Sequence, residues 1–148
     1  MSSLGGVSME KVLVTEEKLL ELFDFAVQAS RLSYSPYSKF PVGAAILTSD
    51  GRIFTGCNVE NRSYGLTNCA ERTAVFNAVT EGATKISAVA IATPKSDYPV
   101  GPCGACRQVL SEFGDGSVPV IFGPGLENLK RSTIGELYPF DSLHELAD

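Results

Sequence analysis

The sequence has no tryptophan, a single histidine and no excess of positive charge. Its 148 residues carry 12 lysines and arginines against 17 aspartates and glutamates, for a formal net charge of -5. A chain that holds nucleic-acid phosphates non-specifically needs the opposite balance. A protein that binds single strands also needs basic and aromatic surface. We therefore expect no nucleic-acid partner, and a small neutral or cationic substrate instead.

Long apolar runs are also missing. No stretch approaches the roughly 18 apolar residues that a membrane helix needs. Residues 1–10 lack the basic region and the apolar run of a secretory signal. These absences predict no membrane partner and a cytoplasmic localisation. In that compartment the four cysteines are expected to be thiols or metal ligands rather than disulfides.

The pattern of apolar residues predicts one domain over residues 13–148, preceded by a flexible segment at residues 1–12. Thr15 is a plausible helix N-cap, because a helical repeat of apolar residues follows it. Asp50-Gly51 is typical of a tight hairpin. The order of elements indicates a three-layer α/β/α sandwich with a mixed β-sheet. The expected strands are 40–48, 52–57, 86–93 and 118–122, and the later helices are 69–81, 103–113 and a short turn from 134.

Three cysteines and a glutamate form the most informative pattern, in Cys69-Ala70-Glu71 and Pro102-Cys103-Gly104-Ala105-Cys106. Three thiolates supply three corners of a tetrahedral zinc site and leave the fourth open, as in catalytic zinc. Cys69 and Cys103 stand at predicted helix starts, where free N–H groups favour a thiolate. Glu71 is a proton carrier beside such a metal.

Three thiolates around Zn²⁺ leave a local charge of about -1, which weakens the acidity of a bound water. Arg72 follows Glu71, and Arg107 follows Cys106. We expect both guanidinium groups to hydrogen-bond the sulfurs and withdraw charge from them.

Other interpretations of the same residues stay open at this point. The Cys-x-x-Cys pair alone is also typical of a redox dithiol. Cys57 or His144 could complete a closed structural zinc site, although Cys57 by itself suggests a buried small side chain. Glu71 falls at the third position of a helix that Asn68 would cap, so it could simply be a capping-box acid.

Four blocks of sequence carry a wider resemblance. They are Ser35-Pro-Tyr-Ser-Lys-Phe-Pro-Val-Gly-Ala-Ala45, Phe54-Thr-Gly-Cys-Asn-Val-Glu-Asn61, Cys69-Ala-Glu-Arg-Thr-Ala74 and Pro102-Cys-Gly-Ala-Cys-Arg-Gln-Val109. The cysteine blocks match the zinc deaminase signature, with Cys69 where many relatives carry histidine. Over residues 15–143 the chain resembles cytidine deaminase of the small, homotetrameric, three-cysteine type.

The resemblance implies hydrolytic deamination of cytidine and deoxycytidine to uridine and deoxyuridine, with release of ammonia, in pyrimidine salvage. It implies one Zn²⁺ per subunit on Cys69, Cys103 and Cys106. Glu71 would move protons from the attacking water to N3 and to the leaving amino group. The alternatives are a deaminase of another aminopyrimidine, such as blasticidin S, and a non-catalytic zinc-binding module.

The resemblance also carries over a set of substrate-binding residues. It assigns Phe40 to the ring, Asn58 and Glu60 to the ribose 3′-hydroxyl, the backbone at Ala70 to the base, and Tyr64 and Phe140 to contacts between neighbouring subunits of a homotetramer. The chain departs from the family at its tail. The family tail often has a spacer before the phenylalanine, whereas this chain reads Leu137-Tyr138-Pro139-Phe140.

Overall fold

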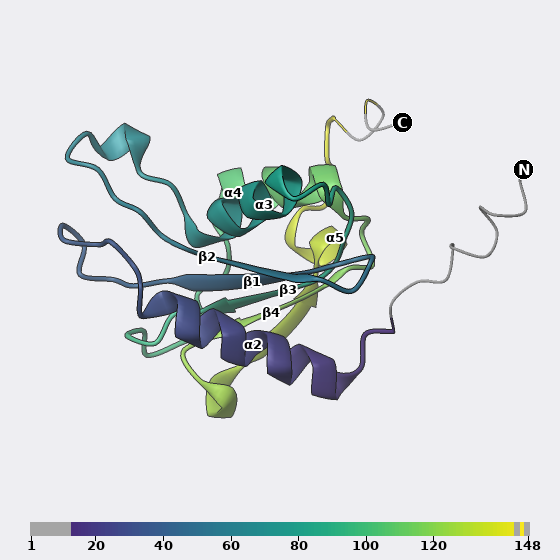
Figure 1. Cartoon of the computed structure of the whole chain (residues 1–148), viewed down its shortest axis with the longest axis horizontal. Coiled ribbons are helices and arrows are strands. Elements are labelled where there is room, and N and C mark those ends of the chain that lie inside the picture. Colours follow the sequence, from purple (N-terminus) through teal and green to yellow (C-terminus); the bar gives the residue numbers. More distant parts are fainter. Residues whose placement is uncertain (1–12, 144–145, 147–148) are drawn as a thin grey trace, which may run out of the picture.

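The computed structural model describes residues 13–143 and 146, so the segment expected to be flexible, residues 1–12, lies outside it. One mixed sheet lies between two layers of helices (Figure 1). The predicted three-layer α/β/α fold is confirmed. The described helices are α2 (Glu16–Ser30), α3 (Ala70–Thr80), α4 (Gly104–Phe113) and α5 (Ile134–Leu137), with single 3₁₀ turns η1 (Tyr64–Leu66) and η2 (Leu126–Asn128).

The sheet has the strand order β2-β1-β3-β4-β5. Only β3 and β4 are parallel among these neighbours, and the other pairs are antiparallel. The central strand β3 is buried on both faces, as its run of small and β-branched residues predicts. The strands are β1 (Gly43–Thr48), β2 (Ile53–Cys57), β3 (Ile86–Ala92), β4 (Pro119–Gly123) and β5 (Lys130–Thr133).

Local signals in the sequence set the first three elements. The Thr15 side chain accepts a hydrogen bond from the Lys18 backbone N–H and caps α2, as predicted. The turn between β1 and β2 contains Gly51 with a φ of 91°, a conformation that glycine adopts without strain. β1 begins at Gly43, later than the predicted start at residue 40, because the segment before it turns away to form loop contacts.

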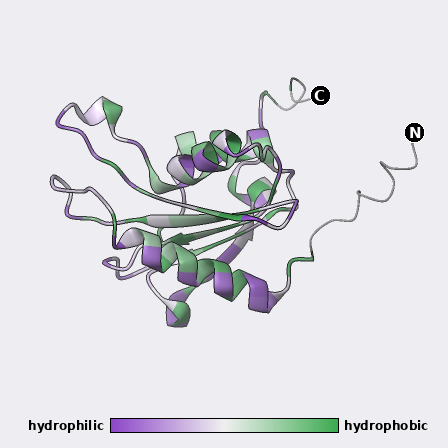
Figure 2. Ribbon diagram, in the orientation of Figure 1, coloured by the Kyte–Doolittle hydropathy of each residue, from purple (hydrophilic) through white to green (hydrophobic). Residues whose placement is uncertain are grey.

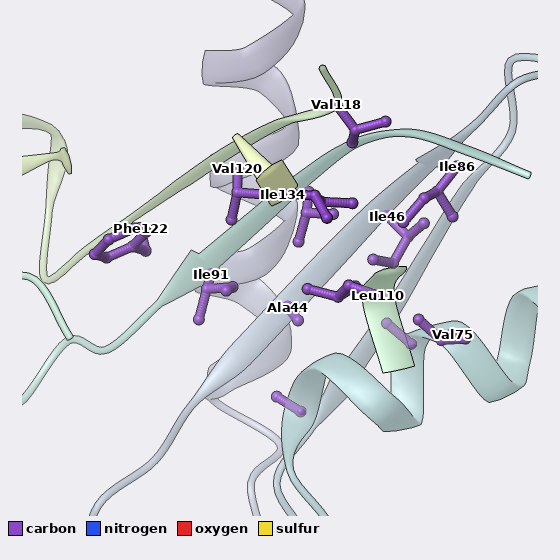
Figure 3. Packing of buried hydrophobic residues seen from close by; sticks show 13 residues of the cluster. Ala44, Ile46, Val75, Ile86, Ile91, Leu110, Val118, Val120, Phe122 and Ile134 are labelled. Atoms are coloured by element: carbon purple, nitrogen blue, oxygen red, sulfur yellow. The ribbon is translucent and has the colours of Figure 1, made fainter. Parts of the chain in front are cut away.

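Each face of the sheet has its own apolar core. On one face α2 buries Leu22, Phe23 and Ala26 against small side chains of β1 and β3. On the other face α3, α4 and α5 cover a second cluster, whose side chains point into one layer (Figure 3). The apolar sides of the helices face the sheet (Figure 2). Helices therefore shield both faces, and loops at the sheet ends remain available for polar chemistry.

Two glycines let helices approach the sheet at backbone distance. A Cβ atom at Gly43 would lie 2.0 Å from the carbonyl oxygen of Ala26 in α2. A Cβ atom at Gly56 would lie 2.4 Å from the backbone nitrogen of Ala74 in α3. Gly56 thus fixes the height of α3, the helix that begins with the Cys69 motif, above the sheet.

One strand of the sheet was not expected from the sequence. β5 was not predicted, because an edge strand that reads Lys-Arg-Ser-Thr lacks the alternating apolar pattern of a half-buried strand. Within residues 13–143 and 146, no helix combines the length and the apolarity needed to cross a bilayer.

Candidate metal centre

The three cysteines of the predicted zinc site lie at the starts of two neighbouring helices. Cys69 is the N-cap of α3, and Cys103 is the N-cap of α4, each with an extended backbone. Cys106 lies in the first turn of α4, and its backbone N–H points at the Cys103 sulfur, 3.5 Å away. Both helix dipoles therefore present their positive ends to the sulfurs and favour thiolates there.

The sulfur positions fit a tetrahedral zinc ion. The Sγ atoms of Cys69 and Cys103 are 3.8 Å apart, and all three sulfurs lie within 4.8 Å of one another. Four ligands at a Zn–S distance of about 2.3 Å place sulfurs about 3.8 Å apart in a tetrahedron. A dithiol redox pair does not explain the third sulfur, so the geometry favours the metal.

The group contains three cysteines and, across the described part of the chain, no fourth histidine, cysteine or carboxylate. Cys57 lies elsewhere and its thiol donates to the Leu32 carbonyl oxygen, so the suggestion that Cys57 closes a structural site is wrong. Cys57 is also only half-buried, contrary to the expected buried side chain. His144 lies outside the described residues. An incomplete set of protein ligands is typical of catalytic zinc.

Glu71 is buried beside this cluster and is only 4% exposed. We expected Asn68 to cap the helix, but Cys69 is the cap, and the Asn68 side chain donates instead to Thr73 Oγ1. Glu71 is therefore the second residue of the helix. A capping box needs its acid at the third position, so the capping-box interpretation is wrong. Burial, followed by the negative charge of Cys69, raises the pKa of Glu71 to about 7.

Arg72 donates from Nη2 to the Cys69 sulfur at 3.2 Å, which agrees with the predicted contact. A hydrogen bond with Cys106, and then the bond from Arg72, lower the pKa of Cys69 to about 5. The same contact with Cys69, and then burial, raise the pKa of Cys106. These directions favour a thiolate at Cys69, and Cys106 would have to lose its proton to bind a metal cation.

Arg107 does not make the predicted contact with a sulfur. Its Nε donates to the carbonyl oxygen of Pro102 at 2.7 Å, and its Nη1 donates to that of Leu137 at 2.8 Å. These two carbonyls belong to the loop before Cys103 and to the end of α5. The expected role of Arg107 is therefore wrong. Arg107 links the loop before Cys103 to the end of α5, whereas Arg72 and the two helix starts withdraw charge from the sulfurs.

A second loop runs beside the metal centre and carries Asn58 and Glu60. Val59 and Asn68 exchange two backbone hydrogen bonds of 2.9 Å, which places this loop directly before Cys69. The Tyr34 backbone pairs with the same loop from the other side, through Asn58 and Glu60. Figure 1 shows both loops, the one between α2 and β1 that contains Tyr34 and the one between β2 and α3, projecting from one end of the sheet. The structure therefore brings the predicted sugar-binding residues near Cys69, the first of the predicted zinc ligands.

Asn58 is buried, and its amide joins the loop of residues 58–68 to the loop of residues 31–42. Its Oδ1 accepts from the Val42 N–H at 3.0 Å and from the Ser33 hydroxyl at 2.5 Å, while its Nδ2 donates to the Phe40 carbonyl at 2.9 Å. Since the amide nitrogen has two hydrogens, one donor position remains for a ligand. The same bond holds Phe40, which is half-buried, next to Asn58.

Glu60 accepts three hydrogen bonds from the loop opposite. The backbone N–H groups of Tyr37 and Ser38 donate to Oε1 at 3.0 and 3.1 Å, and the Ser38 hydroxyl donates to Oε2. The Ser38 hydroxyl is the largest cause that lowers the pKa of Glu60, so the carboxylate stays charged. We did not single out Ser38 from the sequence, although it stands inside the Ser35–Ala45 block.

The three remaining predicted site residues, Ala70, Tyr64 and Phe140, differ in burial and in distance from the cysteines. Ala70 is fully buried as the first residue of α3, next to Cys69. Tyr64 is 75% exposed and contacts the Tyr37 ring at 5.8 Å between centroids. Phe140 is fully exposed, has a φ of 56°, and borders a cavity of about 840 Å³ beside the amino ends of β3 and β4. The chain alone therefore does not bring Phe140 to the cysteines.

Comparisons with known proteins point to one zinc-binding family. The family model for the cytidine and deoxycytidylate deaminase zinc-binding region matches residues 16–122. The cytidine deaminase of Sporosarcina psychrophila is 49% identical over 112 residues, which cover 76% of this chain and 82% of that protein. The crystal structure of cytidine deaminase from Burkholderia pseudomallei has a TM-score of 0.78 at 42% identity, covering 86% of this chain and 98% of that chain.

A more distant relative bears on the alternative substrate. The blasticidin-S deaminase of Bacillus cereus is 34% identical over 127 residues, which cover 81% of this chain and 89% of that protein.

The contact between Arg72 and Cys69 predicts the effect of removing that guanidinium. Arg72→Met keeps most of the apolar stem but leaves the thiolate without its donor, so we expect zinc affinity to fall about 10- to 100-fold. Competition with a chromophoric zinc chelator at fixed pH measures the change. Arg31→Met, at an exposed position after α2, is the matched control. Unchanged affinity in Arg72→Met would contradict the role given to Arg72.

Proposed function

Since the chain belongs to the cytidine and deoxycytidylate deaminase family, we propose that it hydrolyses cytidine and deoxycytidine to uridine and deoxyuridine, with release of ammonia. The observation that carries this proposal is the burial of Glu71 beside three converging cysteine sulfurs. A non-catalytic zinc module has no need for a buried carboxyl group next to an incomplete ligand set, because burying a carboxyl is costly.

Cys69, Cys103 and Cys106 would hold one Zn²⁺ per subunit, and the bound ion would supply a Lewis acid that makes water a stronger nucleophile. Glu71 accepts the proton that this water loses as it adds to C4 of the cytosine ring. Glu71 passes that proton to N3. Glu71 then takes the remaining proton of the hydroxyl added to C4 and delivers it to the amino nitrogen, which leaves as ammonia as the C4 carbonyl forms. The backbone around Ala70, next to Cys69, orients the base.

Asn58 and Glu60 would recognise the sugar. Each keeps one hydrogen-bonding position after its contacts within the protein: a hydrogen on Nδ2 of Asn58 and a lone pair on the Glu60 carboxylate. A ribose 3′-hydroxyl can accept from the first and donate to the second. The charge on Glu60 repels a phosphate at this position, so nucleosides bind better than nucleotides. Phe40 packs near the base.

The runner-up is a deaminase of another aminopyrimidine such as blasticidin S. Its support is the relative of Bacillus cereus, which is 34% identical, whereas the cytidine deaminase of Sporosarcina psychrophila is 49% identical. The pairing of Asn58 with Glu60 favours a nucleoside, because an amide and a carboxylate together match one sugar hydroxyl. Reduced cysteines at the metal site fit the cytoplasm, where the reaction would serve pyrimidine salvage.

The chain would assemble as a homotetramer in which neighbours complete each site. Tyr64 and Phe140 are the residues assigned to this role, and both present aromatic surface that their own chain leaves exposed. Exposed aromatic side chains are typical of surfaces that pack against a partner.

Deamination itself tests the proposed function. Wild-type protein loaded with zinc should convert cytidine and deoxycytidine. The loss of the ultraviolet absorbance of the cytosine ring measures this conversion. Glu71→Gln keeps the shape of the side chain but cannot carry the proton, so kcat should fall at least about 100-fold. Glu112→Gln, on the exposed side of α4, is the matched control.

Two results would contradict different parts of the proposal. If zinc-loaded wild type leaves both nucleosides unchanged while it converts blasticidin S, the runner-up is correct. If Glu71→Gln is as active as wild type, the proton-carrying role of Glu71 is wrong.

Light scattering coupled to gel filtration tests the proposed assembly. The expected mass is four times the chain mass of 15.7 kDa. A Phe140→Ser protein should dissociate more readily on dilution than wild type if this ring packs against a neighbour. A stable monomer of the wild-type protein would contradict the proposal.

A further inference from the structure

Ser38 occupies a central position in the loop that faces Glu60. Its hydroxyl donates to Oε2 of Glu60 and accepts the backbone N–H of Phe40 at 3.0 Å. A serine hydroxyl has one donor hydrogen and two acceptor lone pairs, so both bonds form at once. One side chain thus joins the carboxylate proposed for the sugar to the backbone of the aromatic proposed for the base.

The backbone around Ser38 depends on the same carboxylate. Lys39 has a φ of 58°, in the left-handed region that a lysine seldom adopts without support. The preceding N–H groups, of Tyr37 and Ser38, both point at Oε1 of Glu60. The Lys39 N–H closes the turn on the Ser35 carbonyl at 3.0 Å. The Glu60 carboxylate is therefore the centre around which residues 37–39 fold.

The direction of the Glu60 carboxylate follows from these contacts. Two N–H groups anchor Oε1, and the Ser38 hydroxyl is the donor that the structure gives to Oε2. A carboxylate held at one oxygen still rotates about that anchor, and a second donor at the other oxygen stops the rotation. Without Ser38, Glu60 would keep its charge but lose the fixed angle at which its free lone pair meets a hydroxyl.

We propose that Ser38 is a positioning residue that sets the preference of this enzyme for nucleosides with a free 3′-hydroxyl, by holding Glu60 at the angle that accepts this group. The inference rests on the proposed function and deepens it. This role of Ser38 differs from simple stabilisation of the loop in its effect on substrates. A loosened loop lowers kcat/KM for every cytosine nucleoside alike, whereas a misaligned Glu60 lowers kcat/KM only for a substrate that has the 3′-hydroxyl.

The experiment compares kcat/KM for cytidine and for 3′-deoxycytidine, on zinc-loaded wild type and on variants of Ser38. In Ser38→Ala the ratio of the two values should fall about tenfold, because a hydrogen bond to a charged group typically has an effect of that size. Ser38→Thr keeps the hydroxyl and should restore most of the ratio. Ser38→Gly is the second variant without a hydroxyl, should the alanine protein fail to fold.

Ser117→Ala is the matched control. The Ser117 hydroxyl also donates to a carboxylate, Oδ1 of Asp115 at 2.5 Å, but it lies in the turn before β4 and not in the loops that carry Asn58 and Glu60. Its ratio should match wild type. A double variant sharpens the test: in a Glu60→Ala background, the further change Ser38→Ala should leave the ratio unaltered, because the group that Ser38 positions is gone.

The outcomes separate the two proposals. Equal losses on both nucleosides in Ser38→Ala and Ser38→Gly, or no loss on either, would overturn the role of Ser38 while cytidine deamination stands. Failure of Ser38→Thr to restore the ratio would overturn it as well. Wild type that converts neither nucleoside would overturn the proposed function, and the role of Ser38 with it.

Discussion

The structure depends on the meeting of two helix starts at one end of the sheet. α3 and α4 pack beside each other on the same face, and each begins with a cysteine at its N-cap. The approach of α3 to Gly56 and the course of the chain from β3 into α4 bring Cys69 and Cys103 within 3.8 Å. Neither motif alone supplies three sulfurs, which converge only when both helices are docked.

This convergence concentrates negative charge, and the surroundings oppose it by two means. The free N–H groups at both helix starts place partial positive charge around the sulfurs. Arg72 adds a full charge and a direct bond to Cys69. Arg107 acts elsewhere, since it links the loop before Cys103 to the end of α5. Arg107 thus fixes the position of the loop before Cys103, whereas Arg72 opposes the negative charge of the sulfurs.

The sequence was sufficient for the elements with strong local signals. Thr15, Gly51 and the cysteine spacing each predicted what the structure contains, because caps, turns and ligand motifs are local chemistry. Contacts between distant segments could not be predicted in this way. The partners of Arg107 lie 5 and 30 residues away, and Ser38 meets Glu60 across 22 residues. β5 is an edge strand defined by pairing with β4 and not by its own apolar pattern.

X-ray absorption spectroscopy at the zinc edge tests the central claim most directly. The purified protein should contain one zinc per chain, with three sulfur neighbours at about 2.3 Å and a single lighter neighbour at about 2.0 Å. That shell is what Cys69, Cys103 and Cys106 provide when the fourth position belongs to water. A shell of four sulfurs, or protein that folds and turns over cytidine without zinc, would contradict the account.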